Sequence, residues 1–383
     1  MMEEKSKEST HVVKAAIVTW IKYNNFGTFL QAYALQQMLS RMGIDSCILD
    51  DHTIIEEGRS AKSSNVLRSS FFSCRRMLSI LYRYGVESYL KGKQSDKLYT
   101  QFKHEHLHID AHIQPLTALN DKYDIFICGS DQIWYPSSLI FSPYYYLDFA
   151  TKKKIAYAPS IGTTQYPTVF IPKVRPLLER FDSLSVREKM GADIIGSIVG
   201  RKVPAVLDPT LLLEREDWER LALSKTFCKK DYLLCYFLTY NEIYVRYAVE
   251  YARRHSLRIV TFTIPGLKNN FADVVLAAGP QEFVTAIKYA RVIFTDSFHG
   301  TIFSLHYQKE FYTFKRFDDD APNNQNSRVN NLLQLAGLKR HFIDKDSLSL
   351  IESLPAIDYE IVDCNLSRER EKSIQYLKDS LNN

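Results

Sequence analysis

The sequence has no run of about 18 apolar residues, which argues against a membrane-spanning helix. Residues 1–10 are polar and charged and lack the apolar centre of a signal peptide. The six cysteines are scattered, with no Cys-x-x-Cys spacing and no neighbouring histidine pairs. This pattern is typical of reduced thiols that bind no zinc. Together these absences predict a cytoplasmic protein.

A strong excess of one charge is also missing. The 49 Lys and Arg against 44 Asp and Glu leave a net charge of only +5. No polybasic run occurs, and no aromatic ladder alternates with lysines, so no nucleic-acid partner is expected. The charge supports at most a weak attraction to anionic ligands and a peripheral association with the inner membrane surface. The sequence leaves open whether the chain forms a homo-oligomer.

Two further classes of site lack their usual residues. The loop 22–28 lacks the three glycines of a dinucleotide fingerprint, so neither NAD nor FAD is expected as a cofactor. His104, His106 and His108 alternate, but in a strand they would share one face without an acidic partner. We therefore predict solvated histidines and no metal site.

What is present is the composition and patterning of a soluble α/β protein. The 383 residues, with 45% hydrophobic and 24% charged residues, are enough for two domains. Short β-branched runs at 12–19, 47–50, 123–128, 154–160 and 183–186 predict strands, and so does the run 203–213. A second alternating series follows, with strands predicted at 232–238, 258–263, 291–295 and 310–314 and helices between them. Two such series predict two Rossmann-like lobes that face a cleft.

The boundaries that we expect follow from this alternation. The N-terminal lobe takes residues 1–182 and includes a helical insertion at about 52–113. The C-terminal lobe takes residues 183–365. A charged amphipathic helix over 366–383 is expected to cross back onto the first lobe.

The segment 295–301 (TDSFHGT) carries the strongest indication of chemistry. It follows a hydrophobic strand and precedes a helix, so the helix N-terminus would present N–H groups to an anion. His299 at that place is suited to proton transfer near neutral pH. The alternative is that Asp296 or Ser297 caps the helix while His299 fills a gap.

Three weaker segments also lie where predicted strands end. Arg187, in the segment 185–188 (SVRE), is able to bind a carboxylate or phosphate through two parallel hydrogen bonds; the alternative is an Arg–Glu surface pair. In the segment 129–134 (GSDQIW), Gly129 permits a turn and Ser130, Asp131 and Trp134 suit a sugar; the alternative is a capped turn with a buried Trp. The loop with Asn25 and Gly27 is able to receive a phosphate or a sugar.

Taken together, these segments resemble the polysaccharide pyruvyl transferase family. The matching segments run in order from about residue 14 to 340 and are Asn25-Phe26-Gly27 with 30–35 (LQAYAL), 129–134 (GSDQIW), 146–149 (YLDF), 185–188 (SVRE), Asp208-Pro209-Thr210 and 295–301 (TDSFHGT). The resemblance implies a fold similar to that of GT-B glycosyltransferases. It also implies transfer of a pyruvyl group from phosphoenolpyruvate to two hydroxyls of a sugar, in a cell-surface polysaccharide or its lipid-linked precursor.

The resemblance also implies roles for residues. His299 and Arg187 would be catalytic, with protonated His299 as the proton donor, and phosphoenolpyruvate would be a co-substrate with no other cofactor and no metal. On the C-terminal, donor side, the binding residues would be Asp296, Ser297, Gly300, Thr301, Arg316 and Arg328. On the N-terminal, acceptor side, they would be Asn25, Gly27, Gly129, Ser130, Asp131 and Trp134.

One departure from the family pattern stands out. Many members carry Arg-Leu-His-Gly where this chain has Ser297-Phe298-His299-Gly300. The missing Arg removes a positive charge, for which Lys315, Arg316 or Arg328 are the candidate replacements. Two rival functions stay open: a glycosyltransferase whose Asp296 or Glu282 grips the ribose of a nucleotide sugar, and a non-catalytic factor that binds glycans or assists assembly.

Overall fold

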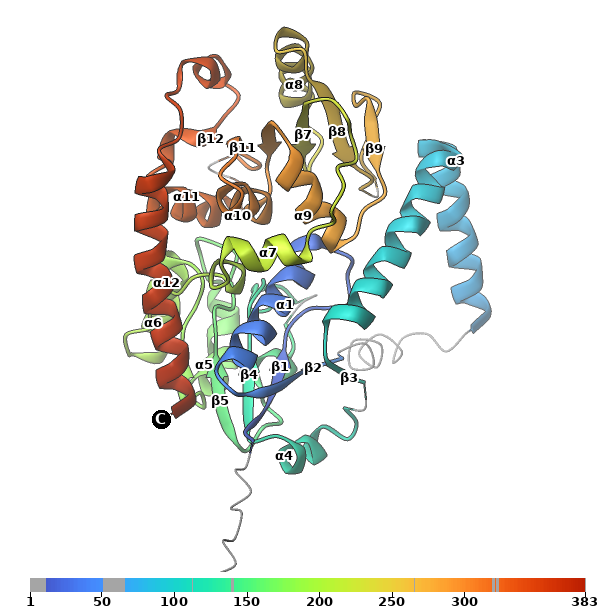
Figure 1. Ribbon diagram of the computed structural model, residues 1–383. Coiled ribbons are helices and arrows are strands. Elements are labelled where there is room, and N and C mark those ends of the chain that lie inside the picture. Colours follow the sequence, from blue (N-terminus) through green and yellow to red (C-terminus); the bar gives the residue numbers. More distant parts are fainter. Residues whose placement is uncertain are drawn as a thin grey trace, which may run out of the picture.

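The chain folds into two parallel six-stranded sheets, one in each half of the molecule (Figure 1). The computed structural model describes residues 12–50, 66–111, 113–138, 141–264, 266–318, 321 and 324–382, with 66–84 described by their backbone alone. The sheets confirm the predicted α/β fold with two Rossmann-like lobes. Residues 1–10, which we expect to contain no signal peptide, lie outside the described residues. So do residues 52–65, the beginning of the expected insertion.

Both sheets have the same strand order. The first has the order β3-β2-β1-β4-β5-β6 and consists of β1 (Lys14–Val18), β2 (Asp45–Leu49), β3 (Ile109–Asp110), β4 (Ile125–Cys128), β5 (Lys153–Ala156) and β6 (Ser183–Leu184). The second has the order β12-β11-β10-β7-β8-β9 and consists of β7 (Tyr232–Tyr236), β8 (Arg258–Phe262), β9 (Val274–Leu276), β10 (Val292–Thr295), β11 (Glu310–Phe314) and β12 (Phe342–Ile343). The order reverses between β1 and β4 and between β7 and β10, and ligands bind at such switch points.

The helices cover the sheets and fill the space between the lobes (Figure 1). They are α1 (Phe26–Arg41), α3 (Val66–His106), α4 (Leu119–Lys122), α5 (Ile171–Leu178), α6 (Lys189–Val199), α7 (Arg215–Leu221), α8 (Glu242–Arg254), α9 (Pro280–Tyr289), α10 (Phe298–His306), α11 (Asn326–Leu335) and α12 (Tyr359–Asn382). Helix α3 breaks at Gly85, where φ is 81°, and forms two arms at the side of the molecule.

An aromatic cluster joins the lobes next to their facing ends. Phe26, the first residue of α1, stacks on Phe283 of α9 with ring centroids 4.7 Å apart and on Tyr99 of α3 at 5.7 Å. Its ring also contacts Phe262 of the second sheet at 5.1 Å. Burying several aromatic rings at one point is strongly favourable. The cluster therefore fixes the N-terminus of α1 against the C-terminal lobe.

The lobe boundary lies further along the chain than expected. Strand β6 pairs with β5, and α6 packs into the core of the first lobe, so the expected division at 182/183 falls inside that lobe. Helix α12 begins at Tyr359, before the expected 366, and runs along the side of the molecule from one lobe to the other (Figure 1). In the first lobe, the Tyr376 hydroxyl donates to the Ala156 carbonyl at 3.3 Å, and the Leu381 carbonyl accepts from Lys153 at 2.9 Å.

One local prediction was wrong, and one was confirmed in part. The run 203–213 is not a strand: it pairs only through an isolated bridge at Ala205 and then forms the 3-10 turn η4 (Pro209–Leu211), because prolines at 204 and 209 interrupt a ladder. The histidines were predicted to be solvated: His104 and His108 are exposed, whereas His106, the last residue of α3, is half-buried. Among the described residues, no helix is both long and apolar enough to cross a membrane.

Candidate functional site

A pocket of about 210 Å³ lies between the carboxyl ends of the two sheets. The residues that follow β1 and β4 line it from one lobe, and those that follow β7 and β10 line it from the other. They include Asn25, Thr28 and Asp131 from the first lobe, and Leu238, Asp296, Ser297, Phe298, His299, Arg316 and Arg328 from the second. The pocket therefore occupies the switch points of both sheets, where the fold leaves a crevice.

Two helix N-termini meet at this pocket. Asn25 caps α1 by accepting from the Thr28 N–H at 3.2 Å, and Ser297 caps α10 by accepting from the Gly300 N–H at 3.2 Å. His299, in the first turn of α10, lies directly against Gly27, in the first turn of α1: a β-carbon on Gly27 would stand 1.8 Å from His299 Nδ1. The positive ends of two helix dipoles thus converge on one space, which favours an anionic ligand.

On its other side, His299 faces the buried carboxylate of Asp208. The distance from His299 Nε2 to Asp208 Oδ2 is 3.6 Å, and the Asp208 side chain is fully buried. Burial raises the pKa of Asp208, but hydrogen bonding and charge from His299 and Arg187, together with Thr210, lower it, and the net pKa lies well below its usual range. Asp208 is therefore an ionised carboxylate that faces the ring of His299.

Arg187 is held by the same carboxylate. Its Nη1 donates to Asp208 Oδ2 at 2.7 Å, and its Nε lies 3.6 Å from Glu188 Oε1. The Arg187 side chain is only 2% exposed, yet its Nε and Nη2 have no hydrogen-bond partner among the described residues. Buried donors that are left open cost free energy unless a ligand satisfies them. The surface alternative for Arg187 is therefore excluded by its burial.

A second cavity, of about 180 Å³, adjoins the first behind Phe298 and Arg328, which line both. Arg187, Glu188 and Asp208 are among its walls. The Phe298 ring lies between two guanidinium groups, at 4.6 Å from that of Arg187 and 5.8 Å from that of Arg328. Burial and the charge of Arg187 lower the pKa of Arg328 to about 10, so it stays a cation at neutral pH.

On the N-terminal side, Asp131 is the acidic group that lines the pocket. It accepts a short hydrogen bond from the Thr28 hydroxyl and one from the Gln132 N–H at 2.8 Å. Ser130 lies behind it and is fully buried; its hydroxyl is 2.9 Å from the Ala158 carbonyl and 3.2 Å from Asp208 Oδ2. Asp131 is therefore placed to contact a hydroxyl ligand, whereas Ser130 supports Asp208.

The two carboxylates considered for binding a ribose, those of Asp296 and Glu282, already accept hydrogen bonds from nearby backbone N–H groups. Asp296 accepts from the N–H groups of Leu238 at 2.6 Å and Thr239 at 3.1 Å, and burial is the main cause that raises its pKa to about 6. Glu282 accepts from the Gly279 N–H at 2.9 Å at the N-terminus of α9. Neither carboxylate is left free to hold two sugar hydroxyls.

Several residues expected in the site face elsewhere. Trp134 is 1% exposed, stacks on Tyr146 and donates from Nε1 to the Tyr145 carbonyl at 3.0 Å, so its ring belongs to the core and not to a sugar platform. Thr301 is buried against Thr313 at 2.8 Å. Gly129 and Gly300 allow close packing, since a β-carbon would stand 1.9 Å from the Tyr157 carbonyl oxygen and 2.3 Å from Thr295 Oγ1, respectively.

Of the three cations weighed as replacements for the missing Arg, two line the pocket. Arg328 donates to Gln325 at 2.7 Å, and its Nε is buried and has no hydrogen-bond partner in the part of the chain that the structure describes. The Nε of Arg316 donates to the Thr239 hydroxyl at 2.7 Å. Lys315 lines a different cavity with Thr164 and Asp344.

Sequence reasoning gave no role to Asp208, Phe298 or Thr28. The signal for Asp208 was available, because a lone carboxylate in the apolar run 203–213 requires buried partners. Nothing in the sequence indicated that Thr28 would donate to Asp131, since the two are 103 positions apart.

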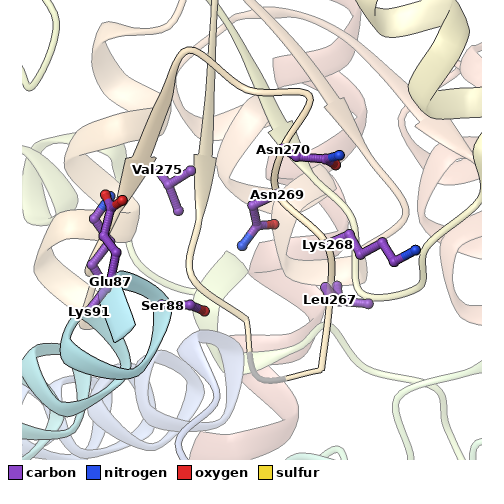
Figure 2. A pocket seen from close by; sticks show the side chains of 8 residues that line it. All are labelled: Glu87, Ser88, Lys91, Leu267, Lys268, Asn269, Asn270 and Val275. Carbon is purple, nitrogen blue, oxygen red and sulfur yellow. The ribbon is translucent and has the colours of Figure 1, made fainter. Parts of the chain in front are cut away.

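A larger cavity of about 490 Å³ lies away from these residues, between α3 and the loop before β9 (Figure 2). It is lined by Glu87, Ser88, Lys91, Leu267, Lys268, Asn269, Asn270 and Val275. Glu87 forms an exposed ion pair with Lys91 one helical turn later, at 2.7 Å.

Within the described part of the chain, no group of three or more His, Cys, Asp or Glu side chains is arranged to hold a metal ion.

Comparison with known proteins agrees with the geometry. The family model described as polysaccharide pyruvyl transferase matches residues 25–316. This range includes every residue that lines the pocket except Trp20, Tyr23, Phe317, Gln325, Phe342 and the α11 side chains. No curated protein matches the chain at the level of sequence.

Solved structures share the two-lobed fold at low identity. A protein assigned as a UDP-N-acetylglucosamine 2-epimerase from Listeria monocytogenes is 10% identical, with a TM-score of 0.52 over 96% of this chain and 91% of that one. MnaA of S. aureus, in a co-structure with UDP, is 10% identical, with a TM-score of 0.50 over 97% of each chain. These similarities confirm the arrangement of lobes similar to that of GT-B glycosyltransferases and carry no information on substrate.

Proposed function

Since the chain belongs to the polysaccharide pyruvyl transferase family, we propose that it transfers a pyruvyl group from phosphoenolpyruvate to two hydroxyls of a sugar. The acceptor would be a cell-surface polysaccharide or its lipid-linked precursor, modified in the cytoplasm, and the product a cyclic pyruvate ketal. The observation that carries the proposal is the position of His299 where two helix N-termini meet. Arg187 is close by, and two of its buried nitrogens have no hydrogen-bond partner among the described residues. Phosphoenolpyruvate has the phosphate and carboxylate that such a site attracts.

The chemistry requires one proton donor. Protonated His299 delivers a proton to the methylene carbon, and the first sugar hydroxyl attacks the neighbouring carbon, which bears the phosphate. The bond between that carbon and the phosphate oxygen then breaks, and the second hydroxyl closes the ring. Of the two hydroxyl protons, one restores protonated His299 and the other leaves with inorganic phosphate. Asp131 is our candidate to orient the attacking hydroxyl.

The anionic donor needs more positive charge than His299 supplies. The guanidinium groups of Arg187 and Arg328 both lie near the Phe298 ring, and both have buried N–H groups that make no hydrogen bond to any described residue. We assign Arg328 as the replacement for the Arg that this chain lacks at position 297. The glycosyltransferase alternative is disfavoured by the engagement of Asp296 and Glu282 with backbone N–H groups.

The first experiment compares thermal melts of the chain with phosphoenolpyruvate, a uridine diphosphate sugar and plain phosphate. A ligand at about 100 times its Kd adds roughly 2.7 kcal/mol of stability, which is readily detected. We expect stabilisation by phosphoenolpyruvate that is lost in His299→Gln. The matched control is His255→Gln, which breaks another His–carboxylate pair in the same lobe, at 3.3 Å from Glu352, outside the site.

The second experiment measures the reaction. Deleting the gene in the source cell should remove acid-labile pyruvate from its surface polysaccharide, and the gene for the unaltered chain, but not for His299→Gln, should restore it. Stabilisation by the nucleotide sugar alone would instead favour a glycosyltransferase. No response to any of the three ligands, with unchanged pyruvate content after deletion, would favour a non-catalytic role.

A further inference from the structure

We propose that Asp208 is a positioning residue that holds the Nε2–H of His299, so that Nδ1 is the ring nitrogen that exchanges a proton with the substrate. The role of His299 rests on the proposed function, but the tautomer itself does not. Three observations carry the proposal: the contacts of Asp208, the two sides of the His299 ring, and the sharing of one carboxylate between both lobes.

The contacts of Asp208 divide between its two oxygens. Oδ1 accepts from the N–H of Thr210 at 3.0 Å and from its hydroxyl at 2.7 Å, which closes the turn η4. Oδ2 accepts from Arg187 at 2.7 Å and from Ser130 at 3.2 Å and faces His299 at 3.6 Å. One oxygen therefore serves the backbone turn, while the other is directed at the site. A residue that only capped the turn would need the first oxygen alone.

The two nitrogens of His299 have different surroundings. Nε2 is buried and makes no hydrogen bond within the described residues, and the carboxylate of Asp208 is the acidic group beside it, at 3.6 Å. Nδ1 lies at the first turn of α1, against Gly27, where no side chain intervenes. A carboxylate beside one imidazole nitrogen fixes the proton there and leaves the other nitrogen free to accept or donate. His299 lines the pocket, and Nδ1 is the ring nitrogen that does not face Asp208.

Asp208 also ties the lobes together at this point. Ser130 follows β4 and Arg187 follows β6, both in the first lobe, whereas His299 is in the first turn of α10 in the second. Its carboxylate therefore sets the distance between the proposed anion-binding Arg and the proposed proton donor. The low pKa of Asp208 means that it stays charged and does not take the proton itself.

Other charged groups face His299 from the remaining walls of the pocket. Asp131 approaches from the end of β4, Asp296 from the end of β10, Arg316 from the end of β11 and Arg328 from α11. Only Asp208 is within ion-pair distance of the ring among the residues that the structure describes. Removal of its charge should therefore dominate any change at His299.

The test is the tautomer of His299, read from nitrogen chemical shifts of the full chain labelled with ¹⁵N-histidine and assigned by the loss of one signal set in His299→Gln. Above the titration of the ring, we expect the Nε2–H form in the unaltered chain. In Asp208→Asn that preference should be lost. The control is Asp217→Asn, because Asp217 is also a buried carboxylate paired with arginines, Arg41 and Arg220, but lies outside the site.

An Nδ1–H form in the unaltered chain would overturn the proposal even if Asp208→Asn failed to fold. An unchanged tautomer in folded Asp208→Asn would do the same. Because neither result uses phosphoenolpyruvate, failure of the proposed donor would leave this test intact.

Discussion

Gly27 and His299 belong to different lobes, and they lie so close that a single β-carbon on Gly27 would stand 1.8 Å from His299 Nδ1. We expect Gly27→Ala to displace the His299 ring and to lower pyruvyl transfer by roughly 100-fold, since a misplacement of about 1 Å has an effect of that size. Gly27 is inside helix α1, where Ala is intrinsically favoured by about 1 kcal/mol, so an overall unfolding is not expected from helix propensity.

The measurement pairs the thermal melt of Gly27→Ala with the pyruvate content of the polysaccharide. Gly92 is the control, because a β-carbon there would meet no atom within 4 Å. Full activity in a folded Gly27→Ala variant would show that His299 tolerates displacement and would count against its role.

Arg328 and Arg316 provide a matched pair of cations on one pocket wall. Arg328→Gln should weaken binding of phosphoenolpyruvate by about 10-fold to 100-fold, because a hydrogen bond to a charged group contributes about 1.5–3 kcal/mol. Arg316→Gln should have the smaller effect, since the Nε of Arg316 already donates to Thr239. Calorimetric titration measures both, and equal losses would contradict the assignment of Arg328 as the replacement cation.

The buried carboxyl of Asp296 should make stability depend on pH. Its folded pKa of about 6 exceeds the ordinary value of 3.8, so the folded state binds the proton more tightly than the unfolded state. Its contribution to stability is therefore present below about pH 4 and is lost as pH rises through about 6, by roughly 3 kcal/mol in all. Urea unfolding at several pH values, with Asp296→Asn as reference, isolates this contribution. A difference between the two proteins that does not change with pH would refute it.

Trp134 distinguishes a packing role from a sugar-stacking role. Because its ring is buried on Tyr146 and its Nε1 is hydrogen-bonded, Trp134→Phe should lower the unfolding free energy by about 1–3 kcal/mol. Pyruvate content and the stabilisation by phosphoenolpyruvate should stay at the level of the unaltered chain. A folded Trp134→Phe variant with normal stability and no pyruvate transfer would restore the sugar-stacking interpretation.

Much of the architecture could be predicted from local pattern. Strands such as β1 and β10 are short apolar runs, and the helices after them begin at capping residues, Asn25 and Ser297. Periodicity and capping are properties of neighbouring residues, so they are visible in the sequence. The run 203–213 misled because its apolar residues serve a linker that is buried between the lobes, which periodicity does not distinguish from a strand.

The site could be predicted only in part, for a related reason. The segment 295–301 indicated His299, since a strand, a polar turn and a helix in succession place a residue at a sheet edge. Trp134 was assigned to the site wrongly because the burial of its ring depends on Tyr145 and Tyr146, which contact it from a later turn of the chain. Asp208 was missed because its partners Ser130, Arg187 and His299 are 78, 21 and 91 positions away.

The sequence by itself determined that this chain alternates strands and helices in two series and presents His299 and Arg187 where strands end. Short-range hydrophobic pattern and capping chemistry are enough for that. Only the tertiary structure decided that Gly27 would meet His299, that Arg187 would be buried, and that one carboxylate would hold both lobes at the site. These outcomes depend on how the two sheets are packed around Phe26 and the linker, and that packing is set by contacts between residues far apart in the chain.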